Sequence, residues 1–250
     1  MTEPVMVKLE ICIDSVESAV AAKAGGADRV ELCDSLIEGG TTPSAGMIAE
    51  TRHQVDIGLQ VMIRPRGGDF YFSDAEASVM RRDVAMAKQL GADGVVIGCL
   101  NGDGTIDTER SRALIEIARP LNVTFHRAFD MTRDAYEGLD ALIDLSVDRI
   151  LTSGQESTVL EGSELIADLN QRAGDCVIIM PGGGVTEQNL ARILKLTQVS
   201  EIHIGTRHPV ESGMQFRNER VFMGGELRPP EYLRLIANPT DVKKLRNTLS

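Results

Sequence analysis

The sequence predicts an α/β protein of the (β/α)8 barrel class, the TIM barrel. Eight short apolar segments of strand type alternate with eight helical patterns along the chain. The strand segments recur roughly every 20–35 residues, the length of one strand–helix unit. This alternation predicts parallel strands joined by helical crossovers. Eight such units within 250 residues favour a closed barrel over an open sheet.

Each predicted strand is a short aliphatic run, and several of the predicted helices begin at a good capping residue. We expect strands at residues 9–14, 28–33, 59–65, 94–100, 122–129, 148–153, 176–181 and 201–206. We expect helices at residues 15–24, 43–54, 74–90, 107–118, 134–145, 162–172, 186–196 and 229–236. Ser15, Ser73 and Thr186 are the N-cap residues of three of them. Gly-Ala-Asp at 26–28 and again at 91–93 ends a helix and leads into the next strand.

The chain shows no linker, low-complexity run or shift in composition, so we expect one domain over residues 1–250. Residues 207–250 follow the last barrel strand and form a predicted extension, with a long loop at 208–228 and an extra helix. Loops of that length in compact domains are often lids or binding loops.

Composition restricts the partners of the protein. The net charge of −11 argues against non-specific binding to nucleic acid or to anionic membranes. The chain has no apolar run of transmembrane length, and its N-terminus lacks the pattern of a signal peptide. We therefore expect a cytoplasmic protein. The four cysteines contain no CxxC pair and do not indicate a disulfide framework.

A short phrase occurs twice near the N-terminus. Residues 9–14 read Leu-Glu-Ile-Cys-Ile-Asp, and residues 30–34 read Val-Glu-Leu-Cys-Asp. Side chains two apart in a strand share a face, so Glu10 lies beside Cys12 and Glu31 beside Cys33. A carboxylate within a strand is unfavourable unless that face is polar or functional. The repeat therefore predicts one polar centre built from both strands.

Other strands add charged side chains to the same inward face. Arg64 ends the third strand, His126 lies on the fifth and His203 on the eighth. Isolated buried charges cost several kcal/mol each, so pairing or function must compensate. With Glu10 and Glu31 they predict a catalytic or ligand-binding pocket at the C-terminal mouth of the barrel. An ion-paired plug that fills the barrel is the alternative.

The loops at the same mouth predict an anion site. Arg66 leaves the third strand beside a flexible turn, and an arginine fork suits carboxylate or phosphate. A loop salt bridge from Arg66 to Asp69 or Asp74 is the alternative. Glycines after the seventh strand and before a helix resemble the phosphate site common in these barrels. The remaining candidate anion ligands are Ser153, Gly182, Gly183, Gly184 and Thr206.

Several common chemistries are missing from the sequence. No lysine lies at the C-terminal end of a predicted strand, which argues against Schiff-base chemistry at the mouth. The HExxH zinc pattern, the GxGxxG cofactor pattern and the GxSxG nucleophile pattern are absent as well.

The ordered motifs of this chain resemble the CutC copper-homeostasis family. The similarity lies in residues 9–14, 26–33, 38–44, 63–69, 124–130, 151–155 and 214–218. It implies a (β/α)8 barrel, a cytosolic protein, frequent homodimers and a link to copper tolerance with Cu(I) binding. It also implies that Cys12 and Cys33 are thiolate ligands. Cu(I) prefers thiolate and thioether donors, and Met62 is the adjacent soft donor.

The carboxylates, arginines and histidines of the same face support a second hypothesis. A copper carrier does not need them, whereas an enzyme acting on a small anionic or phosphorylated metabolite does. Glu10, Glu31, His126 and His203 would then have acid–base or divalent-metal roles, and Arg64 would help to hold the anion. A lyase, isomerase or hydrolase would fit, since no redox cofactor motif is present.

Overall fold

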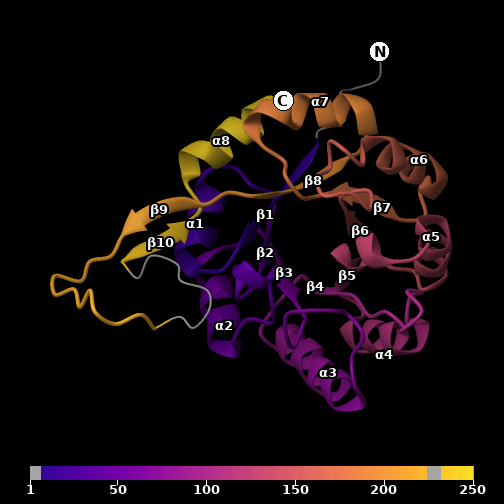
Figure 1. The fold of residues 1–250 in the computed structure, drawn as a ribbon, viewed down its shortest axis with the longest axis horizontal. Helices are drawn as coiled ribbons and strands as arrows, with labels where there is room; N and C mark the ends of the chain where they lie inside the picture. Colours follow the sequence, from indigo (N-terminus) through magenta and orange to yellow (C-terminus); the bar gives the residue numbers. More distant parts are fainter. Residues whose placement is uncertain (1–6, 224–231, 250) are drawn as a thin grey trace.

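The computed structural model describes residues 7–223 and 232–249, and its centre is the predicted (β/α)8 barrel (Figure 1). Eight strands form one sheet in the order β7-β6-β5-β4-β3-β2-β1-β8, and every paired neighbour is parallel. A parallel bridge between Gly182 and His203 joins the two ends of this order. The strands are β1 Lys8–Ile13, β2 Arg29–Leu32, β3 Gly58–Met62, β4 Gly94–Ile97, β5 Asn122–Phe125, β6 Arg149–Thr152, β7 Ile178–Pro181 and β8 Glu201–Gly205.

Helices surround the barrel, and most follow their strand after a capped start. Ser15 and Ser44 each accept a hydrogen bond from a backbone N–H of the first helical turn, and Ser73 forms a capping box with Glu76. The helices are α1 Val16–Ala24, α2 Ala45–Gln54, α3 Asp74–Gln89, α4 Thr108–Ala118, α5 Ala135–Asp144, α6 Ser163–Ala173, α7 Glu187–Thr197 and α8 Pro239–Thr248. Short 3-10 turns lie at Leu36–Glu38 and Arg127–Met131.

Period-two alternation divides the barrel strands into two faces, as predicted. Leu9, Ile11 and Ile13 of β1 belong to the large apolar core between strands and helices. The alternate residues face the barrel interior, where Cys33, Met62 and Val96 form a separate small cluster. Hydrophobic burial against the helices therefore stabilises the outer face and leaves the inner face open to polar chemistry.

The region after β8 differs from the prediction. The predicted loop begins with a strand, β9 His208–Glu211, which pairs antiparallel with β10 Leu233–Ile236. The helix predicted at 229–236 was wrong over its C-terminal half, where β10 lies, and residues 224–231 are outside the described part. Figure 1 shows this hairpin projecting from the barrel.

The extra helix instead begins three residues after the end of β10, where Asn238 caps it and Pro239 takes its first position. This helix, α8, completes the helical ring. It packs against both α1 and α7 (Figure 1). A side chain at Gly25, the C-cap of α1, would meet Val242 of α8 at 2.3 Å, so the two helices approach closely at this glycine. Arg246 of α8 donates to the Gly26 and Val7 carbonyls. Among the described helices, none has the length and apolar character needed to cross a membrane.

Candidate functional site

A network of paired charges fills the barrel interior near the N-terminal ends of the strands. Arg29, at the start of β2, pairs with both Glu10 and Glu201. Arg149, at the start of β6, donates from Nε to Glu201 Oε2 at 2.6 Å. All four side chains are buried. We call these four residues the plug. Of the side chains that the sequence offered for an ion-paired plug, it contains Glu10.

Glu10 links this plug to the mouth through a histidine of β8. The register places His203 directly beside Glu10, and His203 Nδ1 lies 2.7 Å from Glu10 Oε1. Because a carboxylate only accepts, Nδ1 carries the proton of this bond. Burial would raise the pKa of Glu10, but Arg29 and His203 outweigh it and lower the pKa to about 2. Glu10 is thus a firmly ionised carboxylate.

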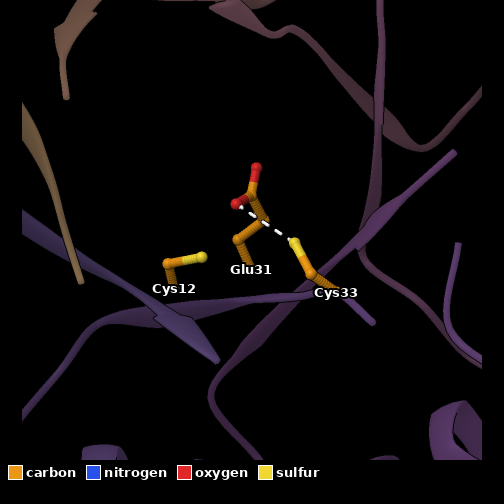
Figure 2. Close-up of side chains that lie close together, drawn as sticks. All are labelled: Cys12, Glu31 and Cys33. Atoms are coloured by element: carbon orange, nitrogen blue, oxygen red, sulfur yellow. Dashed lines mark hydrogen bonds between the residues drawn. The ribbon is translucent and has the colours of Figure 1, made fainter. Parts of the chain in front are cut away.

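The two cysteines of the repeated motif meet around the second glutamate, as Figure 2 shows. A sulfur of Cys12, a sulfur of Cys33 and a carboxylate oxygen of Glu31 all lie within 4.8 Å of one another. The Cys33 thiol donates to Glu31 Oε2 at 3.5 Å. On the other side, His203 Nε2 is 3.8 Å from Glu31 Oε2. Strands β1, β2 and β8 therefore build one thiol–carboxylate–imidazole cluster.

Electrostatics distinguish the members of this cluster. The Cys33 thiol can donate to the Cys12 sulfur in place of Glu31, and this hydrogen bond holds the pKa of Cys12 well below its usual value, against its burial, with His203 as a further partner. The hydrogen bond to Cys12 and burial together raise the pKa of Cys33. Burial raises the pKa of Glu31 well above normal. Burial lowers the pKa of His203, but the charge of Glu31 and its bonds to Cys12 and Glu10 raise it overall.

A loop between β2 and α2 approaches the Cys33 thiol. Gly40 has a φ of +93°, and a side chain there would lie 3.0 Å from the Cys33 sulfur. The residue must therefore be glycine for the loop to approach so closely. Arg64 holds this loop, since its Nη1 donates to the carbonyls of Glu38 at 2.8 Å and Gly40 at 2.9 Å. Its Nη2 donates to Gly68 at 2.7 Å.

His126 lies beyond Arg64 in a second group. Its Nδ1 accepts from the Ala128 N–H at 3.1 Å. The Phe70 ring contacts both the His126 ring and the Arg64 guanidinium, which lies 4.9 Å from the Phe70 ring centroid. Burial, and then the charge of Arg64, lowers the pKa of His126 to about 3. The imidazole is therefore neutral, and its buried Nε2 has no hydrogen-bond partner.

The candidate anion ligands divide between opposite sides of the mouth. Gly183 (φ +121°) faces Arg127, whose Nη1 would lie 3.3 Å from a side chain at that glycine. Arg127 donates from Nη2 to Ser153 Oγ at 2.7 Å and pairs with Asp130 at 2.8 Å. Gly182 forms a parallel β-bridge with His203. A side chain at Gly184 would lie 3.0 Å from the Thr158 methyl group. This group collects the ends of β5, β6 and β7.

Arg66 and Thr206 make no hydrogen bond to that group within the part of the chain that the structure describes. Arg66 follows β3, four strands away from β7 in the barrel order. Its guanidinium pairs with Glu76 and with Asp69 at 3.0 Å, so the loop salt bridge considered as the alternative is present. The Thr206 hydroxyl follows β8 and is enclosed without a hydrogen-bond partner. The role of each predicted site residue stays a prediction.

Sequence reasoning missed the plug residues Arg29, Arg149 and Glu201. Each stands at the first or second position of a predicted strand, where a charge looks like a solvated strand end. The available signal was spacing: Arg29 lies two residues before Glu31, and Glu201 lies two residues before His203. Residues two apart in a strand share a face, so both side chains should point into the barrel.

The fold and the site together define a class: a (β/α)8 barrel with a buried thiol–carboxylate cluster at the C-terminal ends of β1 and β2. The thiamine phosphate pyrophosphorylase of Pyrococcus furiosus has the same fold, with a TM-score of 0.61 over 98% of this chain and 96% of that chain. At 17% identity this similarity concerns the fold alone.

The family is more specific, since the CutC family model matches residues 7–208. The human copper homeostasis protein cutC homolog is 50% identical over 95% of this chain and 87% of its own length. A Bacteroides fragilis CutC family protein is 49% identical over 96% of this chain and 95% of its own. The CutC crystal structure from Streptococcus agalactiae covers 80% of this chain and 98% of that chain, at 37% identity and a TM-score of 0.76. The chain belongs to the CutC family, as the motifs predicted.

Proposed function

We propose that this protein binds Cu(I) as cargo at the barrel mouth, with Cys12 and Cys33 as its ligands. The observation that carries the proposal is the approach of both sulfurs and Glu31 to within 4.8 Å of one another. Cu(I) is a soft ion that prefers thiolates, and the lowered pKa of Cys12 favours the thiolate form that binds metal. Two relatives carry copper homeostasis in their names, which agrees with such a role.

The surroundings also suit a soft cation. Met62 packs with Cys33 in the small inner cluster, so a thioether lies next to the thiols. Glu31 has one carboxyl oxygen that is buried without a partner, and a bound cation would favour its ionised form against the burial that raises its pKa. We expect the protein to act in the cytoplasm, where reduced thiols and Cu(I) persist, and as a homodimer.

A double variant, Cys12→Ser/Cys33→Ser, tests the proposal. We expect its Cu(I) affinity, measured by competition with a chromophoric Cu(I) chelator, to fall by more than about 100-fold, because loss of outer partners alone costs up to that much. The matched control is Cys99→Ser/Cys176→Ser, which removes two thiols outside the cluster and should bind as wild type. Equal affinity of the double variant and the wild type would refute the assignment.

A specific observation favours a second candidate, an enzyme that acts on a small anionic metabolite. Two groups suited to proton transfer, Glu31 Oε1 and His126 Nε2, are buried without partners. Arg127, which lies against Gly183 and is oriented by Asp130, would hold the anion. Under this hypothesis a phosphorylated metabolite raises the melting temperature of wild type and not of Arg127→Met. A broad metabolite screen without any shift would argue against it.

A further inference from the structure

The orientation of His203 is that of a metal ligand. Its Nδ1 is held by the Glu10 carboxylate at 2.7 Å, and Glu10 is itself fixed by Arg29. Histidine ligands almost always donate their second ring N–H to a carboxylate or carbonyl, which fixes the ring and its tautomer. The second ring nitrogen, Nε2, faces the cluster and lies 3.8 Å from Glu31 Oε2. The charge of Glu31 raises the pKa of His203, so a metal that binds here displaces a proton from Nε2.

Four donors of mixed hardness therefore lie around Glu31. Cys12, Cys33 and Glu31 lie within 4.8 Å of one another. His203 Nε2 approaches the same Glu31 carboxylate at 3.8 Å. Glu31 Oε1 is buried and has no hydrogen-bond partner of its own. Two thiolates suffice for Cu(I), and neither the imidazole nor the carboxylate is needed for it. Two sulfurs, a nitrogen and an oxygen are instead the donors that tetrahedral Zn²⁺ takes in proteins.

We propose that the cluster is also a Zn²⁺ site, with Cys12, Cys33, His203 Nε2 and Glu31 as ligands and Glu10 as the residue that positions His203. The inference rests on the proposed function in so far as both metals share the two thiols. It goes beyond it by assigning His203 and Glu31 to a divalent ion. Copper and zinc would then compete for one place while using different ligand sets.

The test loads the full-length protein with Zn²⁺, and separately with Co²⁺ as a spectroscopic substitute. We expect one Zn²⁺ per chain in competition with a chromophoric chelator, and intense Co²⁺ absorption typical of a tetrahedral site with thiolates. His203→Ala should lose both and keep its Cu(I) affinity. Glu10→Gln should keep the ligands and weaken Zn²⁺ binding by about 10–100-fold. His126→Ala is the matched control, because it removes another buried barrel histidine outside the cluster.

The outcomes separate the two proposals. Absence of Zn²⁺ binding by wild type, or equal Zn²⁺ affinity of wild type and His203→Ala, would overturn this inference and leave the Cu(I) assignment standing. Unchanged Cu(I) binding by Cys12→Ser/Cys33→Ser would overturn the proposed function first. If His203→Ala fails to fold, as judged by circular dichroism, Glu31→Gln provides the same test: loss of Zn²⁺ with Cu(I) retained supports the site, and unchanged Zn²⁺ affinity refutes it.

Discussion

Glu10 and Glu31 are the same residue type in the same repeated motif on neighbouring strands, yet their surroundings are opposite. Glu10 is paired with Arg29 and His203, and its pKa falls to about 2. Glu31 has a thiol as its hydrogen-bond donor and one oxygen without a partner, and burial raises its pKa. The difference separates two regions of the barrel: at the closed end both buried carboxylates are paired with arginines, whereas at the mouth one oxygen of Glu31 has no partner.

The largest effect should come from breaking the closed end. Arg29→Met leaves Glu10 and Glu201 buried with one partner fewer each, and breaking such a buried pair typically costs about 3–5 kcal/mol. Urea unfolding followed by circular dichroism measures this loss. Arg172→Met is the matched control, because the Arg172–Asp140 pair is exposed and such pairs contribute at most about 1 kcal/mol. Equal costs for the two variants would contradict the role of the plug.

This contrast shows what the sequence could and could not predict. Strand alternation predicted the inward faces of Glu10, Cys12, Glu31 and Cys33, because side-chain direction in a strand is a local property. The partners are not local. Arg29 and Glu201 are 172 residues apart in the chain, and only barrel closure brings them together. The repeated motif therefore predicted a polar centre, but not that one glutamate would be paired and the other left for a ligand.

The β9–β10 hairpin was missed for a related reason. Leu233 and Leu235 alternate with Arg234, but a run this short does not separate the period of a strand from that of a helix. The pairing with β9, more than 20 residues earlier, decides the outcome. By contrast, α8 follows Asn238 and Pro239, a start signal that is local and readable.

An intermediate effect should separate the two glutamates themselves in the metal-free protein. The ionised Glu10 stabilises the fold above pH 4.5, and this stabilisation is lost as the pH falls toward 2. Glu10→Gln removes it, so at pH 7 we expect the free energy of unfolding to fall by about 2–3 kcal/mol. Glu31 has a raised pKa, so its contribution worsens as pH rises above 4.5. Glu31→Gln should therefore be more stable than wild type at pH 8.

Urea unfolding at pH 5 and pH 8 with a chelator present distinguishes the two cases. The gain from Glu31→Gln should shrink at pH 5, where the unfolded state also begins to hold the proton. A Glu31→Gln variant that is less stable than wild type at pH 8 would mean that the carboxylate is compensated in the absence of metal, and the contrast with Glu10 would fail.

The last expected effect is a change in the pH dependence of stability, and it tests whether the His126 imidazole at the mouth is neutral. Its pKa is about 3 in the folded state, so the unfolded chain binds a proton between pH 6.5 and pH 3 that the folded protein does not. Stability should therefore fall on acidification, by up to about 1.4 kcal/mol per pH unit from this group. His126→Gln should flatten that part of the curve, whereas His53→Gln, at an exposed position on α2, should keep the wild-type slope. A slope unchanged by His126→Gln would show that the imidazole is charged in the folded protein, which would remove the neutral His126 that the enzyme hypothesis uses.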